Sequence, residues 1–400
     1  MVEKPQNVLG ADQRPRFFPV GNAGDLGVEA PPNRHGVALR TWARSLAGMQ
    51  KEALVASSAG GKVWRLVSDE GPYLDGYDEA PFPLAHMTTG MVASYTAELT
   101  ALAKQRGITL PGLRLTLHSH YSMEGSALRG TMVGGALPPE LEVEAGADVD
   151  PETLRALVTD AIATAPVRAL LGPVHQSLFT LTVNGTRLNP DRVRPLAADP
   201  PADPGDPMAK AEPDDGLGAA RVPQPLVRLL TAAERVTTSG GVSSSFAEKQ
   251  SRRLHVRGTC TLRTDGVKQI ELGLRNPVGS TFHFLSEEAP AFGGGGRAPD
   301  AATYISAGIA FCFMTQLGRY AKITRKPLEA YRLVQDTHLP VRAASGDTAS
   351  GFAAPVESHV YLDTPEGEAF ARQALDMSEQ TCFLHALCRT ELQTQVIRPT

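Results

Sequence analysis

The chain has 400 residues, 42% of them hydrophobic, and a formal net charge of −4 at pH 7. Its 39 basic and 43 acidic residues are interspersed, so the basic surface expected of a nucleic-acid-binding protein is absent. Residues 1–15 lack the apolar stretch of a signal peptide, and no window approaches the ~18 apolar residues of a membrane span. We therefore expect a cytoplasmic protein with small-molecule ligands, no nucleic-acid partner and no membrane partner.

The first half of the chain predicts strands surrounding one long apolar helix. In chain order the predicted strands are residues 37–45, 51–56, 62–68, 113–121, 140–145 and 177–183, and the predicted long helix is residues 85–106. Two shorter helices are predicted from Asp150 and from Pro166. Asp150 can cap the first of them, because a side-chain oxygen at this position accepts from free backbone amides, and Pro151 suits the first helical position.

A proline-rich segment then divides the chain. Nine prolines lie between Pro190 and Pro225 among acidic and small residues, a composition that favours an extended linker without a core. After it, residues 226–236 predict a short connecting helix. The strand and helix order then repeats, with strands at 254–262, 267–274, 281–285, 328–338, 357–362 and 391–397, and helices at 301–320, from Thr364 and at 381–388.

Two segments indicate an internal duplication. Residues 68–81 align without a gap on residues 286–299, at an offset of 218 (286 − 68 = 218). We therefore predict an α+β protein with antiparallel strands wrapped on long central helices. Its two domains are residues 30–190 and 226–400, joined by a Pro-rich linker at 191–225. The same offset brings Cys312 onto Ser94 (312 − 218 = 94).

The cysteines are the candidates for chemistry. Cys260, Cys312, Cys382 and Cys388 are too few for a disulfide scaffold. Cys312 lies in the middle of an apolar helix, where an inert buried thiol is the ordinary alternative. Cys382 follows 70 residues later at the start of a short helix. A thiol with a second thiol positioned to trap its oxidised form is what two-cysteine peroxide chemistry needs, although spacing alone does not place the two together.

The second half contains three informative motifs, which are Phe282-His-Phe-Leu-Ser-Glu-Glu-Ala-Pro-Ala-Phe-Gly-Gly through Pro299, the helix Tyr304-Ile-Ser-Ala-Gly-Ile-Ala-Phe-Cys-Phe, and Glu379-Gln-Thr-Cys-Phe. Together they resemble the OsmC/Ohr family, whose members are thiol-dependent peroxidases and relatives of unknown activity. The likeness covers about residues 250–400 and, more weakly, 35–185. The resemblance implies two intertwined subunits with active sites at their interface, so that a fused tandem would form an intramolecular pseudo-dimer. It also implies that Cys312 is the attacking cysteine and Cys382 the resolving cysteine.

The chain departs from the family pattern in several places. In the first half, Ser94 and Ala165 stand where the two cysteines would be, so that half is expected to be silent in thiol chemistry. The peroxidase branch has a glutamate about ten residues before the reactive cysteine, where this chain has Ala302 and Thr303. For the arginine that would favour the thiolate, Arg257 is the main candidate, with Arg263 and Arg40 as alternatives.

Three functions remain open at this point. The first is reduction of an organic hydroperoxide by Cys312 and Cys382, with an external dithiol as reductant. The second is hydrolysis of an acyl or carbonyl substrate by Cys312 with His338 as a nearby base. The third is non-enzymatic binding of apolar small molecules. No cofactor is implied. His118 and His120 share one face of a strand and could ligate a metal, but a hydrogen-bonded role is more common, and no metal site is predicted.

Overall fold

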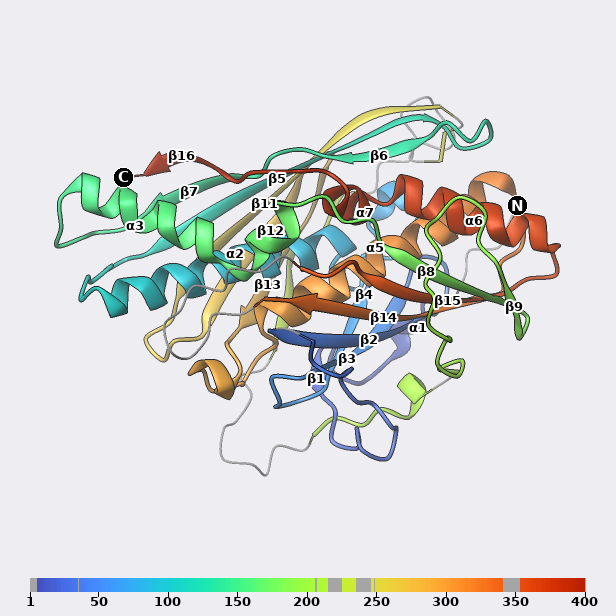
Figure 1. Ribbon diagram of the computed structural model, residues 1–400, viewed down its shortest axis with the longest axis horizontal. Helices are drawn as coiled ribbons and strands as arrows, with labels where there is room; N and C mark the ends of the chain where they lie inside the picture. Colours follow the sequence, from blue (N-terminus) through green and yellow to red (C-terminus); the bar gives the residue numbers. More distant parts are fainter. Residues whose placement is uncertain are drawn as a thin grey trace.

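The structure is a computed structural model that describes residues 6–34, 36–205, 207–214, 225–234, 246–247, 249–340 and 353–399. The protein is mixed α+β, with two multi-stranded sheets and several helices (Figure 1). Each sheet contains strands from both sides of the Pro-rich segment.

The first sheet joins the beginning of the chain to strands near its end. Its order is β1 (Phe18–Pro19), β4 (Trp64–Ser68), β3 (Lys51–Ser57), β2 (Val37–Ser45), β14 (Ala330–Leu339), β15 (Glu357–Asp363), β8 (Leu178–Val183) and β9 (Thr186–Leu188). The central pair is antiparallel, with β14 running along β2 from Arg332↔Arg44 to Leu339↔Val37. Without β14, β2 would be an open edge.

The second sheet is joined in the same way. Its order is β10 (Val227–Thr231), β13 (Val278–Ser286), β12 (Lys268–Asn276), β11 (Lys249–Leu262), β5 (Arg114–Ser126), β7 (Glu140–Glu144) and β16 (Gln395–Pro399), and β6 (Val133–Ala136) pairs with β5. The long pair of β11 with β5 runs antiparallel from Lys249↔Ser126 to Thr261↔Arg114.

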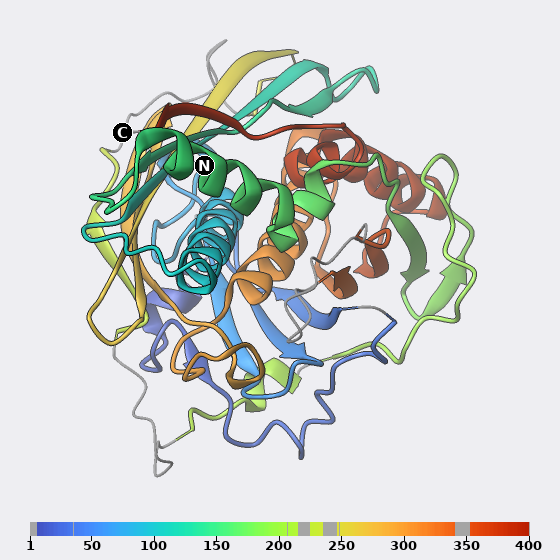
Figure 2. The same ribbon diagram turned by 60° about the vertical axis from the view of Figure 1, so that its left-hand side comes forward.

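Two long helices fill the space between the sheets. Helix α2 (Pro83–Gln105) packs on the second sheet, α5 (Ala301–Thr324) packs on the first, and the two helices lie side by side at the centre (Figure 2). Helix α5 is the one helix in the described part of the chain that is long and apolar enough to cross a membrane, and 89% of its most apolar window is buried inside the protein.

The shorter helices cover the long ones. They are α1 (Val8–Ala11), α3 (Pro151–Thr164), α4 (Pro166–Leu171), α6 (Glu368–Thr381) and α7 (Phe383–Cys388), with 3₁₀ turns η1 (Pro72–Leu74), η2 (Pro207–Lys210) and η3 (Pro290–Phe292). Helix α3 packs on α2 and helix α6 packs on α5. As expected, Asp150 caps α3, accepting from the amides of Glu152 and Thr153.

Two glycines let the central helices approach closely. A Cβ on Gly90 would lie 2.7 Å from the Ala301 oxygen, and a Cβ on Gly308 would lie 2.9 Å from the Met87 nitrogen. Because atoms at these distances overlap, a larger residue at either position would push the two helices apart.

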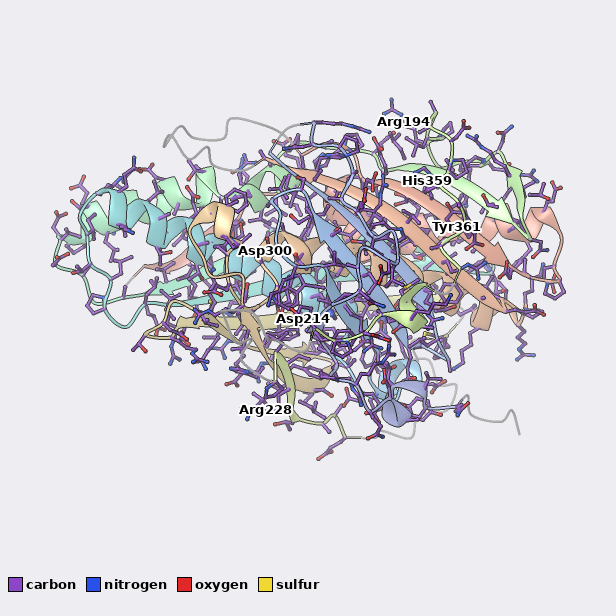
Figure 3. The ribbon with its side chains drawn as sticks, turned by 90° about the horizontal axis from the view of Figure 1, so that it is seen from below. Arg194, Asp214, Arg228, Asp300, His359 and Tyr361 are labelled. Atoms are coloured by element: carbon purple, nitrogen blue, oxygen red, sulfur yellow. The ribbon has the colours of Figure 1, made fainter. Side chains whose placement is uncertain are left out.

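The segment between the halves differs from the sequence prediction. Residues 226–236 do not begin with a helix: β10 (Val227–Thr231) pairs antiparallel with β13. Part of the predicted linker is packed rather than free, because Met208 and Ala211 are buried in a small core with Phe18 and Leu54. The hydroxyl of Tyr361, labelled in Figure 3, donates to the Pro201 carbonyl at 2.6 Å. Residues 206 and 215–224 of the linker lie outside the described residues.

Candidate functional site

Cys312 and Cys382 are brought together in the core. Cys312 lies in the middle of α5, and Cys382 is the residue between the end of α6 and the start of α7. Both thiols are free and buried, and the interaction between them shifts the pKa of each, which places the two sulfur atoms close together. A buried, contacting pair of thiols on two different elements is an arrangement in which one can trap the oxidised form of the other.

The surroundings of the pair favour the thiolate on Cys382. Burial raises the pKa of the Cys312 thiol well above its usual value, and its hydrogen bond to Cys382 adds to this shift. Burial alone would also raise the pKa of Cys382, but the hydrogen bond from Cys312 and the contact with His385 bring that pKa below its usual value. The Leu384 amide, in the first turn of α7, donates toward the Cys312 sulfur.

His385 is a basic side chain in contact with the pair. Its Nδ1 lies 3.2 Å from the Cys382 Sγ. The ring is buried and lies against the rings of Phe179 and Phe313, with centroid separations of 5.5 Å and 5.3 Å. An imidazole in contact with a thiol can hold or move its proton.

Cys312 also lines a small cavity. The cavity has about 20 Å³ of room, enough for a molecule the size of water. The apolar residues that line it include Phe82, Leu254 and Phe383. The polar lining residues are Glu70, Tyr73, Arg252, Thr315, Gln316 and Arg319.

Glu70 is the carboxylate of the cavity, and it comes from the first half of the chain. It is buried after β4, and it accepts hydrogen bonds from the Tyr73 hydroxyl at 2.6 Å and from the Thr315 hydroxyl at 2.7 Å. Burial raises the pKa of Glu70, and Lys51 and the two hydroxyl donors act against that rise. The two donors occupy one oxygen each, which fixes the orientation of the carboxyl group.

Three cations surround this carboxylate. Lys51 is buried and donates to the Met49 carbonyl, and its burial lowers its pKa. Arg252 on β11 keeps a small exposed fraction, whereas Arg319 on α5 is buried. Loss of solvation lowers the pKa of both arginines, that of Arg319 to about 9. Because such cations stabilise nearby negative charge, the cavity favours an anion beside Cys312.

The structure does not bring two of the predicted residues to this site. On β11, Leu254, Val256 and Cys260 are buried in the main core, and alternation places Arg257 on the opposite face, paired in register with His118. On β14, Gln335 and Thr337 contact Ser306 of α5, so His338 points to the other face of the sheet. The expectations that Arg257 and His338 lie beside Cys312 are therefore wrong.

In the first half, Ser94 and Ala165 stand at the positions that correspond to Cys312 and Cys382. Ser94 is buried on α2, and its hydroxyl has no hydrogen-bond partner in the part of the chain that the structure describes. Ala165 precedes α4 as Cys382 precedes α7. No thiol is present at either position, so the cysteine pair has no counterpart there.

The two segments aligned in the sequence have the same local conformation. Each contains a 3₁₀ turn opened by a proline, at Pro72 and at Pro290. A Cβ on Gly76 would lie 1.7 Å from the Glu70 carbonyl oxygen, and one on Gly294 would lie 2.0 Å from that of Glu288. In both segments a glycine is therefore required where the chain passes over the backbone of a glutamate.

The remaining cysteines and histidines lie elsewhere. Burial raises the pKa of Cys260 to about 11 and that of Cys388 to about 12, which leaves both as unreactive thiols. His118 and His120 stack on His255, with the His118 Nδ1 2.9 Å from the His255 Nε2. Among the described residues, no group of three or more His, Cys, Asp or Glu side chains is arranged to hold a metal ion.

Sequence reasoning missed several residues of the site for identifiable reasons. Arg252 lies before the predicted start of its strand at Leu254. Glu70 lies inside the repeated segment of the first half, whereas the family pattern places the carboxylate in the second half, near Ala302. His385 lies three positions after Cys382 in the sequence, and this spacing is the signal for a base beside the thiol.

Neither a family model nor a curated protein matches the chain at a significant level. A similar solved structure is the crystal structure of an OsmC-like hydroperoxide resistance protein from Jannaschia sp. CCS1. It has 19% sequence identity, covers 32% of this chain and 81% of that chain, and has a TM-score of 0.20. The residues of the site, and not this similarity, carry the functional argument.

Proposed function

We propose that this protein reduces hydroperoxides through Cys312 and Cys382. The observation that carries the proposal is the buried contact between the two thiols at a cavity that Cys312 lines and Cys382 does not. Two thiols in contact supply the two electrons that a peroxide bond accepts. The cavity lies against the attacking sulfur. When an organic hydroperoxide binds there, its organic substituent would displace the side chains of Phe82 and Phe383.

The reaction begins with Cys312 as the attacking group. Its proton passes to the Cys382 sulfur, and the Cys312 thiolate attacks the distal oxygen, breaking the O–O bond. The products are Cys312 sulfenic acid and an alkoxide, which leaves as the alcohol after taking the proton from Cys382. The Cys382 thiolate then attacks the Cys312 sulfur to form the disulfide, with hydroxide as the leaving group. An external dithiol reduces the disulfide by thiol–disulfide exchange.

The charged groups of the cavity support the first step. Negative charge moves from sulfur to the leaving oxygen in the transition state, and donors that are already oriented stabilise it most. Arg252 and Arg319 are the charged donors of the cavity, and Glu70 balances them. Asp69 and Glu70 oppose Lys51, Arg252 and Arg319, so one further negative charge, that of the thiolate, balances the set.

We also propose that the chain is a fused pseudo-dimer that arose by duplication. The aligned segments share their conformation, Gly90 and Gly308 are separated by the same 218 residues, and each sheet joins strands from both halves. The site needs both halves, because Glu70 precedes the Pro-rich segment and Cys312 follows it. On this proposal, residues 30–190 supply the carboxylate while residues 226–400 supply the thiols.

The test is a cysteine series assayed by peroxide consumption and by intact mass. Cys312→Ser is expected to abolish consumption. Cys382→Ser is expected to permit one turnover and to accumulate a sulfenic acid that dimedone traps. Cys260→Ser and Cys388→Ser are the matched controls, and we expect both to retain activity. After one equivalent of cumene hydroperoxide, a loss of two hydrogens should map to Cys312 and Cys382. Equal loss of activity in all four variants, or no mass change, would contradict the proposal.

A further inference from the structure

We infer that His385 stores the second proton of the thiol pair and delivers it to the hydroxide that leaves when Cys382 attacks the Cys312 sulfenic acid. This role rests on the proposed peroxide reduction, and it assigns a proton donor to the step in which the disulfide forms.

The geometry places His385 where this proton is needed. Its Nδ1 is 3.2 Å from the Cys382 Sγ, and the Cys312 thiol interacts with that same sulfur. The remaining ring nitrogen, Nε2, is buried with no hydrogen-bond partner among the described residues. The ring therefore has its polar contact with the thiol pair and otherwise lies against Phe179 and Phe313.

The other titratable groups around the pair are less suited to the role. Burial raises the pKa of Tyr121, which lies near the pair on β5, and that of Cys388 on α7, so both hold their protons firmly. Glu70 and Lys51 act on Cys312 from the cavity side. Arg389, directly after α7, and Glu379 in α6 are paired with each other at 2.7 Å. His385 is the group in direct contact with Cys382.

With His385 as a proton donor, the protons released by the site equal the protons taken up by the products. On this proposal the resting site holds two protons, one on Cys312 and one shared between the His385 Nδ1 and the Cys382 Sγ. Reduction of a hydroperoxide by two thiols yields an alcohol, water and a disulfide, and the two products take up two protons. The first proton leaves with the alcohol. The second passes from His385 to the departing hydroxide, leaving a neutral imidazole until an external dithiol restores both protons.

The first half of the chain offers a comparison within the same molecule. Helix α4 begins after Ala165 as α7 begins after Cys382, and the residue three positions on is Arg168 in the first case and His385 in the second. The helix start that lacks the thiol therefore also lacks the imidazole. An arginine cannot release a proton near neutral pH, so Arg168 could not replace His385 in this role.

The first experiment requires no peroxide. The thiolate of the full-length Cys312→Ser protein is titrated by its ultraviolet absorbance, with and without His385→Asn. The asparagine amide can still donate a hydrogen bond but cannot titrate. We expect His385→Asn to move the Cys382 titration to higher pH. An unchanged titration would overturn the inference, whether or not the protein reduces peroxides.

The second experiment measures the lifetime of the sulfenic acid in a single turnover. Loss of a general acid typically slows its step by about 100-fold or more, so His385→Asn should prolong the sulfenic acid and increase dimedone trapping by at least about 10-fold. The matched control is His175→Asn, a buried histidine whose backbone contacts α7. Normal disulfide formation in His385→Asn, or equal slowing in both variants, would overturn the inference.

Discussion

His86 should make the protein sensitive to acid. The ring is fully buried in the first turns of α2, against Phe17 and Phe311 at centroid separations of 5.6 Å and 5.1 Å. Burial lowers the pKa of His86 from 6.5 to about 4, because the apolar surroundings disfavour the imidazolium. In the unfolded chain the same side chain titrates near its ordinary value.

The sign and size of the effect follow from this difference. As the pH falls from 6.5 toward 4, the unfolded chain takes up a proton on His86 and the folded protein does not, so the free energy of unfolding falls. A pKa difference of one between the folded and unfolded states corresponds to about 1.4 kcal/mol. The contribution of His86 is therefore fully present above pH 6.5, and about 3 kcal/mol of it is lost by about pH 4.

The perturbation that isolates this contribution is His86→Phe, with His86→Gln as a second variant. Urea unfolding is followed by the fluorescence of Trp42 and Trp64 at about pH 7.5 and about pH 4.5. Other groups titrate equally in both proteins, so the wild type should lose about 2.5 kcal/mol more than either variant between these conditions. The reasoning is refuted if the variants lose as much stability as the wild type.

Three further predictions concern the site and the assembly of the two halves. Arg252→Met should slow the first reaction with peroxide by at least about 10-fold, since it removes a donor from the cavity. Arg257→Met, on the other face of β11, should leave this rate unchanged. Equal slowing of both variants in stopped-flow assays would contradict the role of the Arg252 charge in the cavity. Ser94→Ala should leave steady-state peroxide turnover within about a few-fold of wild type, because a hydroxyl without an adjacent base is a poor nucleophile. If Ser94→Ala abolished hydrolysis of an activated ester and Cys312→Ser did not, the nucleophile would be Ser94 in the first half and not Cys312. A fragment of residues 226–400 should aggregate or self-dimerise, because it exposes the edges of β11 and β14; a monomeric and active fragment in light scattering would contradict the shared site.

The sequence predicts the bounds of an element well where the hydrophobic periodicity of that element is strong. Helices α2 and α5 and the strands β2 to β4 were predicted close to their observed bounds, because each buries a continuous apolar face. Strand β10 was predicted as a helix, since its exposed Leu229 and Leu230 carry no alternating pattern and its conformation comes from pairing with β13. Such an edge strand is determined by tertiary contact rather than by local preference.

The site was predicted less completely, because side-chain direction depends on details that spacing does not give. The thiols were identified by residue type, and their contact required the turn between α6 and α7. On β11, Arg252 and Arg257 are five positions apart, an odd difference, so one enters the cavity and the other faces away. The predicted strand began after Arg252, which removed the correct arginine from consideration. Glu70 reaches the site only because strands of the two halves pair.

The pairing of β2 with β14 has a consequence during synthesis of the chain. These strands are separated by 285 residues (330 − 45 = 285), and ribosomes add about 5–20 residues per second. Strand β2 therefore leaves the ribosome roughly 15–60 s before its partner exists. For that interval the first half presents an unpaired strand edge, the kind of surface on which nascent chains associate with each other. We expect the yield of folded protein to depend on chaperones that shield this edge until β14 has been made.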